Sequence, residues 1–129
     1  MLRKHRLMNQ KGFTLIEIIA VLVILAILAV IAVPKYMSLV ADSKNKAAMG
    51  GVAEGMGRVN QFVASYMLRN NGSAPTAATV AGASATLGAD AGDFALAYTA
   101  TGSSVQVSAN ATGGNAQGGT ATGIVKMPQ

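Results

Sequence analysis

The feature that most constrains this chain is an uninterrupted apolar run near its N-terminus. The sixteen residues from Ile18 to Val33 are all Ile, Val, Leu or Ala. The segment from Phe13 to Val33 would be about 31 Å long as a helix, which matches the hydrocarbon thickness of a bilayer. A helix that is apolar on every side is buried on every side, in lipid or among other helices. We therefore expect residues 13–34 to form a hydrophobic helix, either spanning a membrane or packed in a helical assembly.

Basic residues are concentrated before this run. The net charge of the chain is +5, and four of its ten basic residues lie within residues 1–12 (Arg3, Lys4, Arg6 and Lys11). From Phe13 onward, six basic residues nearly balance five acidic ones. Positive charge beside an apolar segment holds that end of the chain in the cytoplasm. We interpret residues 1–12 as a basic leader peptide, and we expect no nucleic-acid partner.

The composition argues against catalysis. The chain has no cysteine, and its one histidine, His5, lies in the basic leader. A serine or threonine nucleophile needs an activating base, for which only a few lysines remain. Disulfides and thiolate metal sites are excluded as well. We expect neither an enzyme nor a cofactor.

Composition leaves two interpretations of the apolar run. It could belong to a secretory signal peptide, with a cleavage site at the small residues near Ala32, or it could be a plain membrane anchor. Neither accounts for Glu17 at the start of the run. A carboxylate at the edge of the hydrocarbon costs roughly 2–3 kcal/mol unless it is paired or reaches the interface.

The stretch KGFTLIE, from Lys11 to Glu17, followed by the apolar run, resembles the processing site of type IV pilins and of the pseudopilins of type II secretion. In that family a dedicated peptidase cuts after the glycine on the cytoplasmic side and methylates the new N-terminal residue. The resemblance covers about a quarter of the chain. It implies leader cleavage between Gly12 and Phe13, N-methylation of Phe13, and subunit assembly through Phe13 and Glu17.

These residue types suit that chemistry. Gly12 has no side chain, so a peptidase can approach the scissile bond closely. Cleavage leaves a charged amine on Phe13, which Glu17 of a neighbouring subunit could neutralise when the apolar helices pack together. A buried acid without such a partner is costly, so the pair would fix one axial stagger between helices. The alternative is an interfacial carboxylate whose side chain reaches the headgroups.

Pro34 lacks a helical N–H, so we expect a helix kink near residues 30–34, with a helix boundary as the alternative. Residues 35–72 form a predicted amphipathic helix that ends at Asn70-Asn71-Gly72. Its apolar stripe comprises Val52, Met56, Val59, Phe62 or Val63, and Tyr66. Four glycines interrupt this helix: Gly50, Gly51, Gly55 and Gly57. We favour close packing of a sheet against them over a soft region that lets a filament stretch.

Residues 73–93 form a predicted connecting loop with a short helical turn near Thr86. Residues 94–129 form a predicted small antiparallel sheet with three strands, at 94–99, 105–108 and 123–127, and a flexible loop at 112–123. The fold class is then α+β and pilin-like, in which the apolar half of a long N-terminal helix protrudes and the other half packs on the sheet. Asp90 and Asp93 are too few to hold calcium, which needs six to eight oxygens, so we expect turn and cap roles for them.

The resemblance implies a structural subunit of a type IV pilus-like filament, with adhesion, motility or DNA uptake as later uses. Its implied partners are further copies of the chain in a helical homopolymer, the prepilin peptidase and methyltransferase, and an assembly platform with its ATPase. The precursor would lie in the bacterial inner membrane and the filament at the cell surface or in the periplasm. The alternatives are a type II secretion pseudopilin and a membrane-anchored small binding protein that does not polymerise.

Overall fold

A computed structural model describes residues 12–128. The chain forms two compact units, one ending at Met37 and one beginning at Ser38, and each is described by itself. The long helix α1, Leu15–Arg69, runs through both. The other elements all belong to the second unit: α2 Ala77–Gly82, α3 Ser84–Leu87, β1 Asp90–Ala91, β2 Phe94–Thr101, β3 Ser104–Ala111, the single-turn helix η1 Gly114–Ala116, and β4 Thr120–Lys126.

The first unit consists of residues 12–14, which have no regular structure, and the first part of α1. α1 is long and apolar enough to cross a membrane, with a mean hydropathy of 3.3 over its most apolar 18 residues. Pro34 lies inside the helix and does not end it, so the predicted alternative of a helix boundary is wrong. The kink itself stays a prediction. Residues 1–11 of the predicted basic leader lie outside the described residues.

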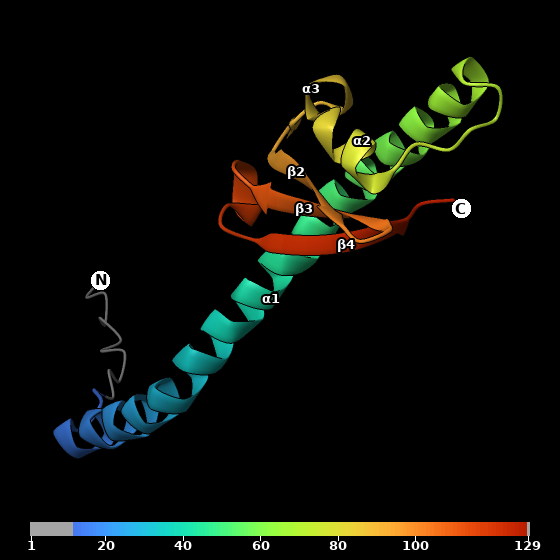
Figure 1. The fold of residues 1–129 in the computed structure, drawn as a ribbon. Helices are drawn as coiled ribbons and strands as arrows, with labels where there is room; N and C mark the ends of the chain where they lie inside the picture. Colours follow the sequence, from blue (N-terminus) through green and yellow to red (C-terminus); the bar gives the residue numbers. More distant parts are fainter. Residues whose placement is uncertain (1–11, 129) are drawn as a thin grey trace, which may run out of the picture. The chain divides into compact units, whose positions relative to one another are not determined.

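The second unit is a four-stranded antiparallel sheet in the order β1-β2-β3-β4, packed on the later part of α1 (Figure 1). The predicted fold class, α+β with a long N-terminal helix on a small antiparallel sheet, is confirmed. The number of strands differs, because the two-residue β1 pairs Asp90 with Ala95 at one edge. β4 also begins earlier than predicted, since its pairing with β3 extends to Asn110 and Thr120. Small polar residues gave no alternating pattern from which these strand residues could be recognised.

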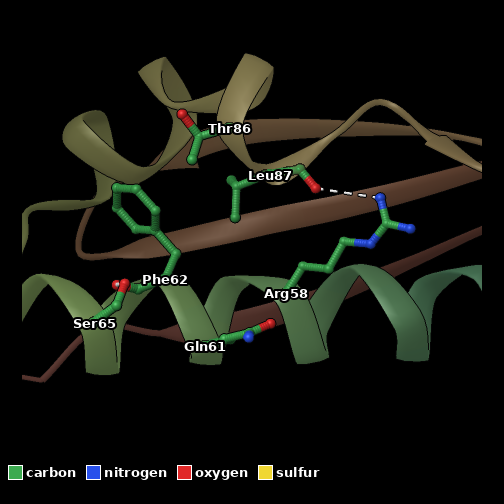
Figure 2. A pocket seen from close by; sticks show the side chains of 6 residues that line it. All are labelled: Arg58, Gln61, Phe62, Ser65, Thr86 and Leu87. Atoms are coloured by element: carbon green, nitrogen blue, oxygen red, sulfur yellow. Dashed lines mark hydrogen bonds between the residues drawn. The ribbon is translucent and has the colours of Figure 1, made fainter.

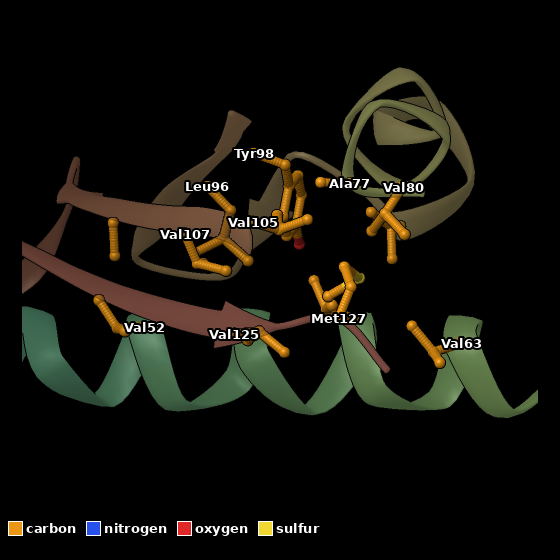
Figure 3. Packing of buried hydrophobic residues seen from close by; sticks show 13 residues of the cluster. Val52, Val63, Ala77, Val80, Leu96, Tyr98, Val105, Val107, Val125 and Met127 are labelled. Carbon is orange, nitrogen blue, oxygen red and sulfur yellow. The ribbon is translucent and has the colours of Figure 1, made fainter. Parts of the chain in front are cut away.

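The core of the second unit lies between α1, α2 and one face of the sheet (Figure 3). Val59, Val80, Val105 and Val107 are its largest fully buried side chains. Three residues of the predicted stripe on α1 are buried, namely Val52, Val59 and Val63, while Met56 and Phe62 pack partly buried against the cluster. The core therefore depends on small β-branched side chains, and α1 supplies one wall of it.

Two of the four glycines in α1 touch the sheet. A Cβ on Gly51 would lie 2.8 Å from Cγ of Phe94, and one on Gly55 would lie 2.5 Å from Cγ1 of Val107. A Cβ on Gly50 or on Gly57 would meet nothing within 4 Å. The packing interpretation therefore holds for Gly51 and Gly55, and it does not account for Gly50 and Gly57.

α1 ends where the sequence predicted. Asn71 and Gly72 both have positive φ, of 50° and 87°, and the Gly72 N–H donates to the Met67 carbonyl at 2.8 Å. This left-handed turn closes the helix C-terminus. The following connection is more ordered than a loop, because it holds α2 as well as the predicted turn at Thr86, which is α3. Thr76 caps α2 by accepting the Thr79 N–H at 3.2 Å, and α2 buries Val80 in the core.

Candidate functional site

The predicted processing site lies at the very start of α1. Gly12, Phe13 and Thr14 are exposed and have no regular structure, and the helix begins at Leu15. A Cβ on Gly12 would meet nothing within 4 Å, so no described part of the chain covers the bond between Gly12 and Phe13. Phe13 is 77% exposed. An irregular, uncovered segment of this kind can be bound by a peptidase as an extended strand.

Glu17 lies in the first turn of α1, and Thr14 caps that turn. The Glu17 N–H donates to Oγ1 of Thr14 at 3.3 Å, and the Ile18 N–H donates to the Thr14 carbonyl at 3.3 Å. Thr14 thus caps the first turn, and Glu17 occupies the third helical position, which is the T-x-x-E spacing of a capping box. The positive end of the helix macrodipole favours a carboxylate in this turn. Glu17 therefore has a local stabilising role that is independent of any neighbouring subunit.

The residues after Glu17 present an apolar surface on all sides. Every residue from Phe13 to Val33 is exposed in the single chain. Large apolar side chains in water are unfavourable at about 25 cal/mol per Å² of exposed area. This part of α1 therefore requires a covering environment, either lipid or other helices.

Within the second unit, Arg58 forms the most connected polar group. Its Nε donates to Glu54 Oε1 at 3.0 Å, and its Nη1 donates to the carbonyls of Leu87, Gly88 and Asp90 at 3.2, 3.3 and 2.9 Å. The hydrogen bond that Arg58 donates to the Glu54 carboxylate raises the pKa of Arg58 above its ordinary value. Arg58 thus ties α1 to the connection between α3 and β1.

Tyr98 supports the same connection from the sheet, because its hydroxyl donates to the Gly88 carbonyl at 3.2 Å. Burial raises the pKa of Tyr98 above its ordinary value, and the nearby Arg58 guanidinium opposes that shift. Next to this network a shallow pocket of about 400 Å³ lies between α1 and α3 (Figure 2). It is lined by Arg58, Gln61, Phe62, Ser65, Thr86 and Leu87. None of these groups forms an acid–base pair with a nucleophile.

Asp93 lies in the turn between β1 and β2, as expected, whereas Asp90 is not a turn residue but the first residue of strand β1. The Asp93 carbonyl accepts the N–H of Thr112 at 2.8 Å, and the Asp90 carbonyl accepts from Arg58. Among residues 12–128, no cluster of three or more Asp, Glu, His or Cys side chains could hold a metal ion. The expectation that calcium is not bound stays a prediction.

Three features were not found by sequence reasoning. Thr14 was overlooked as a helix cap, although the T-x-x-E spacing is a known signal for it. The contacts of Arg58 with the connection, and the bond from the Thr120 N–H to Asn45 Oδ1 at 3.0 Å, had no sequence signal. They join residues about 30 and 75 positions apart in the chain, as the structure alone reveals.

Comparison with protein-family models matches residues 7–33 to the prokaryotic N-terminal methylation motif. Comparison with curated proteins gave no match, and comparison with solved structures gave none either. The matched segment includes Gly12, Phe13, Thr14 and Glu17 and the whole apolar run from Ile18 to Val33. It points to a structural subunit and fits an inner-membrane precursor. The chain thus carries, at residues 7–33, the prepilin-type N-terminal methylation motif of type IV pilins and pseudopilins.

Proposed function

We propose that this chain is a structural subunit of a type IV pilus-like filament. Prepilin peptidase cuts the precursor between Gly12 and Phe13, the new N-terminal Phe13 is methylated, and subunits assemble through the N-terminal part of α1. The observation that carries the proposal is the methylation motif followed by a helix segment whose apolar side chains are all exposed. A plain anchor would need the apolar helix but neither Gly12-Phe13 nor Glu17.

The same helix serves both stages. In the precursor its length suits the hydrocarbon core of the inner membrane, with the basic leader on the cytoplasmic side. In the filament the helices cover one another, which removes the apolar side chains of residues 18–33 from lipid. Glu17 then neutralises the Phe13 amine of a neighbouring subunit. Since an unpaired charge among apolar helices is strongly unfavourable, this pair selects one stagger.

The first test is the N-terminus of the mature protein, measured by mass spectrometry in a host with prepilin peptidase. The proposal requires a chain that begins at N-methyl-Phe13. A chain that begins at Val33 would indicate a conventional signal peptide, and an uncut chain that begins at Met1 would indicate a plain anchor. Either outcome contradicts the proposal.

The second test addresses assembly. Glu17→Ala should leave membrane insertion and leader cleavage intact and abolish or strongly reduce filaments seen by electron microscopy. Glu17→Asp is the matched control, because it keeps the charge and shortens the side chain by one methylene. Normal filaments in Glu17→Ala would contradict the role of Glu17 as a partner of the neighbouring amine.

The alternative within the same class is a pseudopilin of a type II secretion system. The motif is common to pilins and pseudopilins, so the distinction depends on the accompanying machinery. Neighbouring genes for a retraction ATPase favour a pilus, whereas an outer-membrane secretin together with further pseudopilins favours secretion. A membrane-anchored binding protein that does not polymerise is the candidate from another class, and the N-terminus measurement distinguishes it.

A further inference from the structure

The two edges of the sheet differ in how they are protected. Natural proteins shield edge strands by making them very short or by placing prolines and charges along them. β1 follows this rule, since it has two residues. β4 has seven residues from Thr120 to Lys126, without proline, and its single charge is at the last position. β4 is therefore a long and weakly protected edge.

Hydrogen bonds at the two ends of β4 give the direction of its backbone groups. The Met127 N–H donates to the Ser103 carbonyl at 3.0 Å and so points toward the β3 side, whereas the Thr120 N–H donates to Asn45 on α1. Backbone groups alternate along an antiparallel strand. The N–H and C=O groups of Thr122, Ile124 and Lys126 therefore point to the open edge. Within residues 12–128 only the outward N–H of Thr120 has an identified partner.

Ile124 lies at the centre of this open stretch. Its side chain is 63% exposed, because Val125 and Met127 occupy the opposite, buried face of the strand. It is the only large apolar side chain of the four strands that is strongly exposed in the described structure. The open edge thus combines unpaired backbone groups with one apolar side chain between Thr122 and Lys126.

We propose that β4 pairs in antiparallel fashion with β4 of a second copy of this chain, centred on Ile124. In that register Ile124 faces its own copy, and each Thr122 faces the partner's Lys126. All three are outward-pointing positions, so each pair exchanges two N–H···O bonds. No like charges face each other, and the two Ile124 side chains cover one another. The edge is therefore complementary to itself.

This contact is two-fold symmetric, whereas growth of a helical filament uses head-to-tail contacts. If the chain is a filament subunit, as proposed above, β4 pairing joins subunits of neighbouring filaments and produces lateral bundles. That consequence rests on the proposed function, but the strand pairing does not.

The pairing can be tested by cross-linking, because the chain has no cysteine of its own. Full-length Ile124→Cys should form disulfide-linked dimers under mild oxidation. Gln106→Cys is the matched control, since Gln106 pairs with Ile124 one strand further in, at a position that is half-buried on the sheet. In the paired sheets the two copies of residue 106 would lie about 14 Å apart, at three strand spacings, which exceeds the reach of a disulfide of about 7 Å. Equal cross-linking of both variants, or none in Ile124→Cys, would overturn the proposal.

Thr122→Pro in the Ile124→Cys background tests the backbone bonds. Proline removes only an outward N–H there, so the ladder with β3 stays intact while the dimer should be lost. Ile124→Lys places two like charges opposite each other in the proposed register, so it should prevent dimer formation. Gln106→Lys is its control, and thermal unfolding confirms that both variants fold. Dimers that persist in both Thr122→Pro and Ile124→Lys would refute β4 pairing.

Electron microscopy of the same variants separates the two proposals. Where the parent forms filaments, Ile124→Lys should give single filaments and Gln106→Lys should give bundles. A parent that forms no filaments would contradict the proposed function, while cross-linking of the membrane-extracted protein would still decide the pairing.

Discussion

Gly55 and Val107 bring α1 and β3 into direct contact, because a Cβ on Gly55 would lie 2.5 Å from Cγ1 of Val107. Glycine in a helix is unfavourable by up to about 1 kcal/mol relative to alanine. Here the absence of a side chain lets the fully buried Val107 pack against bare helix backbone. Gly123 of β4 makes a similar approach from the sheet, since its Cβ would lie 2.5 Å from Cγ1 of Val52. The core of the second unit therefore depends on contact between backbone and side chains.

Gly55→Ala should destabilise the second unit, although alanine is the better helix former. The added methyl forces Val107 or the helix to shift, and such overpacking costs about 1–3 kcal/mol. For a unit of this size each kcal/mol corresponds to a decrease in Tm of about 4–8 °C, measured by circular dichroism.

Gly57→Ala is the matched control, because a Cβ there would meet nothing within 4 Å. Through helix propensity alone it should raise the free energy of unfolding by up to about 1 kcal/mol, and the Tm should rise with it. A higher Tm for Gly55→Ala than for the parent would contradict close packing at Gly55.

Arg58→Lys should loosen the connection between α3 and β1. A lysine ammonium cannot reproduce the planar guanidinium that reaches Glu54 and three carbonyls together. Amide hydrogen exchange should become faster at Gly88 and at Leu96, whose N–H donates to the Ala89 carbonyl at 2.7 Å. Glu54→Gln serves as the control, since it removes the ion pair and leaves the carbonyl contacts. Unchanged exchange in Arg58→Lys would show that the connection is held by other contacts.

Tyr98 makes stability depend on pH in the alkaline range. Burial raises its pKa in the folded state above the ordinary value of about 10, so the folded state favours the neutral hydroxyl. This contribution is fully present below pH 10 and is lost as the pH rises through the folded pKa. Thermal unfolding from pH 8 to 11 should show the parent losing Tm faster than Tyr98→Phe.

At pH 8 the parent should be the more stable of the two proteins, because Tyr98→Phe lacks the hydroxyl that donates to the Gly88 carbonyl. The variant should be less stable there by about 0.5–1.5 kcal/mol. A difference in Tm between the two proteins that stays constant up to pH 11 would argue against a buried, neutral Tyr98.

The elements that the sequence predicted well are those with strong local signals. The length of the apolar run and the stop at Asn71-Gly72 both follow from local patterns, and the structure confirms α1 and its end at Arg69. Close packing was predicted for all four glycines of this helix, and the structure shows it at Gly51 and Gly55. Local sequence is sufficient to predict an element where one residue type imposes the backbone conformation.

Prediction failed where small residues fold through distant pairing. β1 and the start of β4 consist of Asp, Ala and Thr, and only their pairing with β2 and β3 makes them strands. α2 was missed because its six residues lack a clear period, although Val80 packs in the core. In the predicted processing segment, Gly12, Phe13 and Glu17 were proposed as site residues from the resemblance alone. The cap at Thr14 was missed although its spacing to Glu17 was visible.

Thr14→Val should loosen the first turn of α1 without changing its apolar character. Valine has the shape of threonine but lacks the oxygen that accepts the Glu17 N–H. Loss of an N-cap costs about 1 kcal/mol, which corresponds to roughly a fivefold increase in local opening. In detergent micelles, exchange of the Glu17 amide measured by NMR should accelerate by that factor. Thr14→Ser keeps the hydroxyl and should exchange at the parent rate. Exchange at the parent rate in Thr14→Val, with acceleration in Thr14→Ser, would show that the Thr14 methyl, rather than its oxygen, holds the turn.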